Sequence, residues 1–236
     1  MPSAGAFLAL WNDIAPQREA EYDQWHTLEH VPERVSVDGF LGARRYVNRV
    51  RTSHRYFTLY QTQSIDAFTS AEYLDLLAHP TPWSASMRPD FSNFVRAVCA
   101  VTKSAGTGIG AAIACLCVPV GATDAALLGA VSVASTRPRI NAVLCGRQAE
   151  AGVAVPFSTP PPDSAPLRQF DRVALIEALD REAAEAALQT VKEALGLESL
   201  PRDFGADIYD LASAFPGADP DERRRHRRAG WSRPAS

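Results

Sequence analysis

Chemically versatile side chains are concentrated between residues 22 and 34 of the 236-residue chain. Histidine suits proton transfer because its pKa lies near neutrality, and a nearby carboxylate can fix its tautomer. A histidine next to glutamates, with aromatic and cationic neighbours, therefore indicates acid/base chemistry on a small molecule. The residues concerned are Tyr22, Trp25, His26, Glu29, His30, Glu33 and Arg34.

Helical periodicity leaves the direction of His30 open. Trp25, Leu28, Pro32 and Val35 fall on one apolar arc of a helix over residues 16–35. Pro32 is expected to end or kink that helix just before itself, so His30 could turn inward over a sheet. The alternative is that His26 and Glu29 are surface residues and that His30 only forms hydrogen bonds at the helix end.

The same histidines match the H-x-x-E-H zinc pattern, since the sequence from His26 to His30 reads HTLEH. Histidines four residues apart share a helix face and can hold a metal. Five positions match easily by chance, however, Pro32 is expected to shorten the helix, and no third ligand helix follows. We therefore predict that the chain binds no metal and no other cofactor.

Composition excludes some partners. The net charge is −3, which argues against a nucleic-acid-binding surface. No apolar run reaches the ~20 residues of a membrane-spanning helix, and no basic segment of a signal peptide precedes the apolar start. Four cysteines without CxxC spacing suggest free structural thiols. We expect a cytoplasmic protein with a small-molecule substrate, no nucleic-acid partner and no membrane partner.

Two successive β-α-β-β-α-β patterns, the ferredoxin-like order, must position these residues. We predict first-copy strands at 6–12, 40–49, 55–63 and 94–102, with helices at 16–35 and 64–78 and an irregular stretch between 79 and 93. In the second copy, strands are predicted at 109–120, 140–147, 172–179 and 206–214, with helices at 123–134 and 181–195.

These patterns predict an α+β fold of two tandem ferredoxin-like units, residues 1–105 and 106–218, joined by a linker at 104–108. A proline-rich loop is expected at 156–166, and a basic, disordered tail at 219–236. One such unit leaves a sheet face uncovered, so two in one chain can close an intrachain pseudo-dimeric barrel. Such a chain could be a monomer or could form a homodimer.

The motif region resembles the EthD-like branch of the dimeric α/β-barrel superfamily. The resemblance rests on a W-H-x-x-E-H-V-P-E-R helix end from Trp25 to Arg34 and on a following G-F-x-x-A-R-R-Y strand from Gly39 to Tyr46. It covers residues 20–46 closely and the rest of residues 5–103 by topology. Members of the superfamily include cofactor-free monooxygenases, lactone isomerases, polyketide cyclases, aldoxime dehydratases and haem peroxidase relatives.

The resemblance implies an apolar pocket between helices and sheet. It makes His30 the first candidate for the acid/base group, with Glu29, Arg34 and His26 as further catalytic candidates. One of Arg44 and Arg45 should face the pocket and clamp a carboxylate or an enolate. The expected substrate-binding residues are Tyr22, Trp25, Arg44, Arg45, Tyr46, Tyr56, Tyr60, Trp11 and Trp83, with Thr58 on the same strand face as Tyr56 and Tyr60.

The second copy has no Trp, His or Glu at the corresponding position, in residues 121–138. It is therefore expected to be a scaffold half, which leaves one site per chain. Three functions remain open. The first is a catabolic isomerase, lyase or cofactor-free oxygenase that acts on an aromatic or carbonyl compound through His30. The second is a non-catalytic ligand-binding or accessory protein, and the third is a haem- or metal-dependent enzyme that uses a motif histidine.

Overall fold

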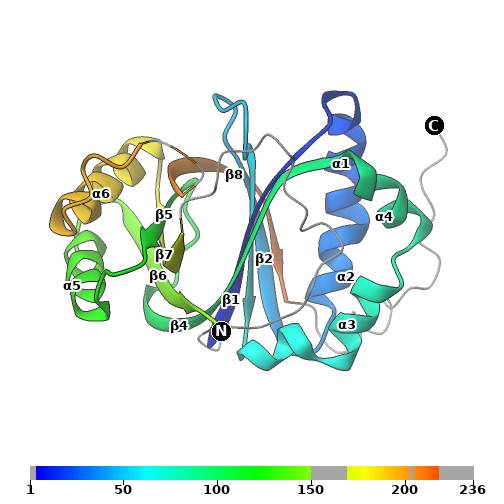
Figure 1. Ribbon diagram of the computed structural model, residues 1–236, viewed down its shortest axis with the longest axis horizontal. Helices are drawn as coiled ribbons and strands as arrows, with labels where there is room; N and C mark the ends of the chain where they lie inside the picture. The colour runs from blue at the N-terminus through cyan, green and yellow to red at the C-terminus, as the bar shows by residue number, and fades with distance from the viewer. Residues whose placement is uncertain (1–3, 150–168, 202, 204, 218–236) are drawn as a thin grey trace.

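The computed structural model describes residues 4–149, 169–201, 203 and 205–217, and over these residues eight antiparallel strands close into a barrel (Figure 1). Neighbouring strands follow the order β1-β3-β2-β8-β5-β7-β6-β4, and β4 pairs with β1 to complete the ring. The strands are β1 (Ala6–Ile14), β2 (Phe40–Val47), β3 (Tyr56–Thr62), β4 (Phe91–Gly106), β5 (Ala112–Pro119), β6 (Ile140–Gln148), β7 (Phe170–Ala178) and β8 (Ala206–Pro216).

The ring consists of two ferredoxin-like half-sheets in one chain. The first contributes β4-β1-β3-β2 and the second contributes β8-β5-β7-β6. They meet at two seams, where Ala43 of β2 pairs with Phe215 of β8, and where Cys99 of β4 pairs with Gln148 of β6. The predicted α+β fold, with an intrachain pseudo-dimeric barrel, is confirmed. Closure also pairs each of the eight described strands with a neighbour on both sides.

The helices lie outside the barrel on two opposite sides (Figure 1). On the second side, α5 (Asp124–Ser135) and α6 (Arg181–Ala194) begin at Thr123 and Asp180, whose side chains accept the N–H groups of Ala126 and Ala183. The helical segments on the first side are η1 (Pro16–Arg18), α1 (Glu19–Trp25), η2 (His26–His30), α2 (Val31–Val35), η3 (Ile65–Thr69), α3 (Ala71–Ala78), α4 (Pro82–Met87) and η4 (Arg88–Asp90).

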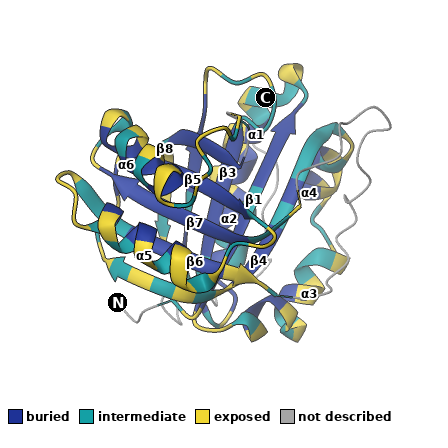
Figure 2. Cartoon of the chain, turned by 60° about the vertical axis from the view of Figure 1, so that its left-hand side comes forward, coloured by how far each residue is buried: buried dark blue, intermediate teal, exposed yellow. Residues whose placement is uncertain are grey.

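Strand alternation separates an inner core from two outer cores. Phe7, Ala9 and Trp11 of β1 point into the barrel, where they join inward side chains of the other strands, among them Phe57 and Tyr209. The alternate residues face the helices. Because both faces are covered, β5 and β7 beneath these helices are almost entirely buried (Figure 2).

The prediction that Pro32 ends the helix before itself is wrong. Residues 26–30 form a π-helical turn, in which the N–H of Val31 donates to the carbonyl of His26, five residues back. Pro32 then lies in the first turn of α2, where its missing N–H costs little. The helical segment therefore continues to Val35.

Two other boundaries differ from the predictions. The stretch predicted as irregular contains α4, which Thr81 caps by accepting the N–H of Ser84 and in which Pro82 takes an N-terminal position. Strand β4 extends to Gly106, so three of the five residues of the predicted linker, 104–106, are paired with β6. The predicted loop at 156–166 and tail at 219–236 lie outside the described residues, and the domain boundaries stay predictions.

All four cysteines are buried and unbridged, as predicted. Burial raises the pKa of the Cys145 thiol to about 12, which makes it unreactive near neutral pH. Among the described residues, no helix is long and apolar enough to span a membrane.

Candidate active site

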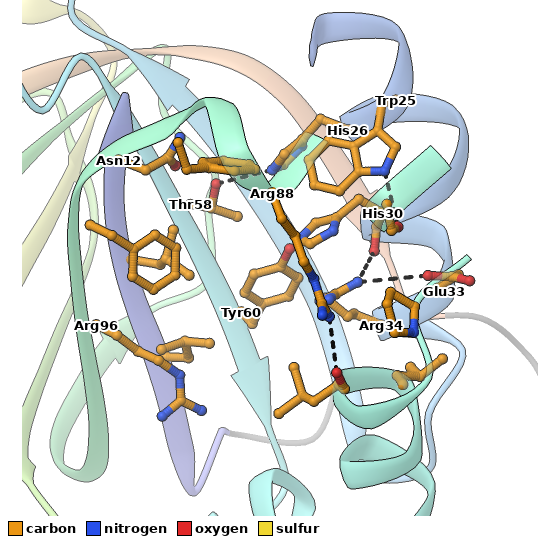
Figure 3. A pocket seen from close by; sticks show the side chains of 18 of the residues that line it. Asn12, Trp25, His26, His30, Glu33, Arg34, Thr58, Tyr60, Arg88 and Arg96 are labelled. Atoms are coloured by element: carbon orange, nitrogen blue, oxygen red, sulfur yellow. Dashed lines mark hydrogen bonds and ion pairs between the residues drawn. The ribbon is translucent and has the colours of Figure 1, made fainter. Parts of the chain in front are cut away.

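A cavity lies between the outer face of the first half-sheet and the helices that cover it (Figure 3). It encloses about 60 Å³ that the centre of a water molecule can reach, several times what one water requires. Its lining residues are Leu8, Leu10, Asn12, Tyr22, Trp25, His26, His30, Glu33, Arg34, Thr58, Tyr60, Tyr73, Leu76, Leu77, Pro80, Ser84, Arg88, Phe91, Phe94 and Arg96.

The π-helical turn directs both motif histidines into this cavity. His26 and His30 are the first and last residues of the turn, and their ring centroids lie 5.3 Å apart. Nε2 of His26 lies 3.4 Å from the hydroxyl oxygen of Thr58 on β3. Nδ1 of each histidine is buried and has no hydrogen-bond partner among the described residues.

Burial keeps both imidazoles neutral at physiological pH. Desolvation lowers the pKa of His26 and of His30 well below the usual range, because a buried imidazolium loses its hydration. The guanidinium of Arg34 lowers both pKa values further, and that of Arg45 lowers the pKa of His26. A neutral imidazole can accept a proton from a bound molecule.

Two tyrosines complete the histidine end of the cavity. The Tyr60 hydroxyl is buried without a hydrogen-bond partner among the described residues, and burial raises its pKa well above the usual range. The Tyr60 ring extends from β3 into the cavity (Figure 3). Tyr22 exchanges hydrogen bonds of 3.2 and 3.3 Å with the side-chain amide of Asn12. Tyr60 therefore presents an available phenol to the cavity, whereas the phenol of Tyr22 is engaged.

Three arginines also line the cavity, among apolar side chains. Arg34 donates to the backbone carbonyl of His30 over 3.0 Å and lies 3.8 Å from Glu33. Arg88 of η4 donates to the carbonyl of Leu77 over 2.9 Å, and desolvation together with the charge of Arg34 lowers its pKa. Arg96 reaches the cavity from β4.

Glu29 does not contact a histidine, which corrects the expectation that it fixes a histidine tautomer. The residue is fully buried, and its Oε1 accepts hydrogen bonds from Trp25 Nε1 (3.2 Å), Thr81 Oγ1 (2.6 Å) and Ser84 Oγ (2.8 Å). Glu29 thus ties the π-helical turn to α4. It is linked to the cavity through two lining residues, Ser84 and Trp25, and the Trp25 ring packs on His30 with centroids 4.1 Å apart.

Of the two strand arginines, Arg45 faces the helices, yet it does not line the cavity. Its Nη2 pairs with Asp23 over 2.5 Å, and its guanidinium lies 4.6 Å from the Tyr22 ring and 4.9 Å from the Tyr56 ring. Tyr56 also packs against Tyr22 and lies outside the cavity lining. These two residues support the wall from behind Tyr22.

Four expected contacts lie elsewhere. Arg44, Tyr46 and Trp11 point into the barrel because alternation sends their side chains to the face opposite Arg45. Arg44 and Glu177 line a second cavity, of about 260 Å³, from the barrel side. Trp83 is buried beside the cavity, and its Nε1 donates to Glu21 over 3.1 Å.

The structure thus brings together six of the predicted catalytic and substrate-binding residues, besides Glu33 and Thr58, and adds others that were not predicted. The six are His26, His30, Arg34, Tyr22, Trp25 and Tyr60. Arg96 could have been found, since it is a lone charge in the apolar strand stretch FVRAVCAV and alternates with Phe94 and Val98. Asn12 and Arg88 carry no such signal in the sequence, because their position in the cavity lining depends on how β1 and η4 pack.

No group of three or more His, Cys, Asp or Glu side chains in the described part of the chain is placed to hold a metal ion. His26 and His30 supply two nitrogens, but Glu33, the one carboxylate of the lining, is not grouped with them, and the other polar groups of the lining are hydroxyls, guanidinium groups and the amide of Asn12. A tetrahedral zinc site with protein ligands needs at least three donors, which this donor set does not provide.

Among the described residues, the equivalent layer of the second unit is dominated by apolar side chains. Beneath α5 and α6 lies an aliphatic core that includes Leu127, Val131, Leu188 and Ile208. Within the described residues, the motif chemistry is confined to the first unit.

The fold and site define a dimeric-type α+β barrel whose two halves belong to one chain. Similar solved structures share this fold. An anthrone oxidase-like protein has a TM-score of 0.56 and 10% identity, over 91% of this chain and 94% of that chain. A candidate monooxygenase from Fusobacterium nucleatum has a TM-score of 0.54 and 13% identity, over 91% and 96%.

A further candidate monooxygenase, from Lactobacillus acidophilus, has a TM-score of 0.50 and 11% identity over 91% of this chain and 97% of that chain. At these identities the likeness establishes the fold. No family model matches the sequence, and no curated protein matches it.

Proposed function

We propose that the chain is a small-molecule enzyme in which His30 is the acid/base group. The observation that carries the proposal is the half-buried imidazole of His30 on the wall of a cavity that it shares with Tyr60 and three arginines. Its Nδ1 is buried without a hydrogen-bond partner among the described residues, and desolvation lowers its pKa so that the ring is neutral. Buried groups with a strongly shifted pKa in a pocket are typical of functional sites.

The proposed step is proton removal from a carbon or oxygen of the substrate. The proton goes to His30, and the electron pair stays on the substrate as an enolate or phenolate. Arg34, whose guanidinium is hydrogen-bonded to the His30 carbonyl, would stabilise the negative charge that develops. His26 and Tyr60 would orient the reacting group from the two sides of His30.

Three outcomes of such an anion are compatible with the site, namely isomerisation, elimination and reaction with O₂. The names of the similar structures, an oxidase-like protein and two candidate monooxygenases, make the oxygenase outcome the first to test. We also propose that the chain belongs to the EthD-like branch, on the basis of the motif in residues 20–46 alone.

The test is solvent deuterium exchange. Purified protein is incubated in D₂O with a panel of hydroxyaromatic and β-dicarbonyl compounds, and exchange is followed by NMR, with O₂ uptake measured in parallel. We expect His30→Ala and His30→Gln to lose at least ~100-fold in rate while the fold is retained. His79→Gln is the matched control, because His79 is an exposed histidine of the same unit.

Wild-type rates in both folded His30 variants would disprove the role of His30. Ligand binding with neither exchange nor O₂ uptake across the panel would favour the non-catalytic alternative. An absorbance spectrum and a metal analysis of the active preparation test the third alternative, a haem- or metal-dependent enzyme.

A further inference from the structure

We infer that the substrate is an aromatic carboxylate and that Arg96 is the residue that binds its carboxylate. This inference rests on the proposed function and names the substrate class for the same cavity. The lining carries three guanidinium groups, of Arg34, Arg88 and Arg96, and one carboxylate, of Glu33. With both histidines neutral, this excess of positive charge favours an anionic ligand.

Arg96 differs from the other two arginines in its surroundings. Its Nη2 is buried and has no hydrogen-bond partner among the described residues. Arg34 and Arg88, in contrast, donate to backbone carbonyls of His30 and Leu77. A buried donor without an acceptor is costly, and a carboxylate is the acceptor that a guanidinium binds best. A ligand oxygen would therefore supply what Arg96 lacks.

Strand register places Arg96 and the histidines at opposite ends of the cavity. Thr58 of β3, Leu10 of β1 and Arg96 of β4 form one row across three strands. Thr58 and Arg96 are two strand spacings apart, which is about 10 Å between backbones. His26 lies over Thr58, and Figure 3 shows the Arg96 guanidinium directed away from that end. One aromatic ring with a substituent at each end fits this span.

The surface between the two ends suits a flat apolar ring. Tyr60, Phe91 and Phe94 line the cavity together with Leu8 and Leu10. Apolar walls with a few polar groups at the ends are typical of small-molecule sites, in which the polar groups fix the orientation. The carboxylate would bind at Arg96, and the acidic C–H or O–H would then lie next to His30.

The test compares benzoate with benzamide, its neutral isostere, by quenching of the fluorescence of Trp25, which lines the cavity. We expect wild-type protein to bind benzoate at least ~10-fold more tightly, which corresponds to about 1.4 kcal/mol. Arg96→Met should remove this preference, and Arg96→Lys should retain part of it. Arg137→Met, at an exposed arginine of the second unit, is the matched control and should retain all of it.

Equal affinity of the wild-type protein for both probes would overturn the inference, and this comparison needs no variant to fold. A folded Arg96→Met protein that keeps the preference would overturn it as well. His30→Gln separates the two proposals. If that variant keeps both the benzoate preference and the exchange activity, only the proposed function fails. If it loses activity while Arg96→Met keeps the preference, only the present inference fails.

Discussion

The indole ring of Trp25 packs against the imidazole of His30 with centroids 4.1 Å apart, and its N–H donates to Glu29 Oε1 and Ser84 Oγ. A buried carboxylate therefore holds the aromatic wall of the cavity without touching either histidine. In the motif, Glu29 is adjacent in sequence to His30, yet its carboxylate is hydrogen-bonded to Trp25, Thr81 and Ser84.

Glu29→Gln should lower the free energy of unfolding by about 1–3 kcal/mol. Three donors converge on Oε1, from Trp25, Thr81 and Ser84, and a neutral amide oxygen accepts them less strongly than a carboxylate. Urea denaturation measures the change. Glu198→Gln, at an exposed position of the second unit, is the control and should change stability by less than ~0.5 kcal/mol. Equal effects of the two substitutions would contradict the role of Glu29 as a tie.

Stability should fall as the pH is lowered from about 7 to 5.5. The pKa values of His26 and His30 are lowered by burial, so the unfolded chain binds protons at these histidines below its pKa of about 6.5 while the folded chain does not. Each histidine then costs up to about 1.4 kcal/mol per pH unit, and above pH 7 the effect vanishes.

Urea midpoints at several pH values measure this slope. His30→Gln should reduce the slope, because one group that titrates only in the unfolded chain is removed. A slope that is unchanged in both His26→Gln and His30→Gln would contradict the assignment of neutral, buried histidines.

The pair between Arg44 of β2 and Glu177 of β7 should couple the two halves of the barrel. The carboxylate accepts hydrogen bonds from Arg44 Nη1 and from the Tyr46 hydroxyl, both over 2.5 Å. Glu177→Ala should cost about 3–5 kcal/mol, because it leaves a largely buried guanidinium without its carboxylate. Adding Arg44→Met should recover part of the loss. In a double-mutant cycle, additivity within ~0.5 kcal/mol would show that the pair does not couple the halves.

Leu188→Ala should destabilise the protein by about 2–5 kcal/mol without changing the affinity of the folded protein for benzoate. Leu188 is 3% exposed in the aliphatic core beneath α5 and α6, on the side of the barrel away from the cavity. Thermal unfolding gives the first quantity and fluorescence titration gives the second. Loss of affinity in fully folded protein would contradict the view of the second unit as a scaffold.

Local pattern was sufficient for most of the fold. The two βαββαβ series could be predicted because strand alternation and helical periodicity are properties of neighbouring residues. The barrel could be predicted because the helices of each unit cover one face of its sheet, so that the two uncovered faces must pack against each other. The boundary errors arose where one local signal outweighed another. Pro32 predicts a helix end, but the π-helical turn before it lets the helix continue with Pro32 in the first turn of α2. Thr81 caps α4 in a stretch whose prolines predict irregular structure.

The candidate site likewise has a part that the sequence predicts and a part that depends on tertiary structure. The sequence by itself identified the segment with His26, His30 and Arg34, because the types and spacing of those residues are local. Which face each residue of the strand Ala43 to Tyr46 presents could not be read from it, since alternation gives two equivalent assignments. Barrel closure decided that Arg45 faces the helices and Arg44 the barrel interior.

Only tertiary structure brought Arg88 and Arg96 to the cavity that the motif histidines line. They lie more than fifty residues from His30 in the chain and reach the cavity through the packing of η4 and the pairing of β4 with β1. Likewise, burial by surrounding elements, which no single segment encodes, lowers the histidine pKa values. The sequence therefore determined which residues could do chemistry, and the closed barrel with its helices decided which of them share a cavity.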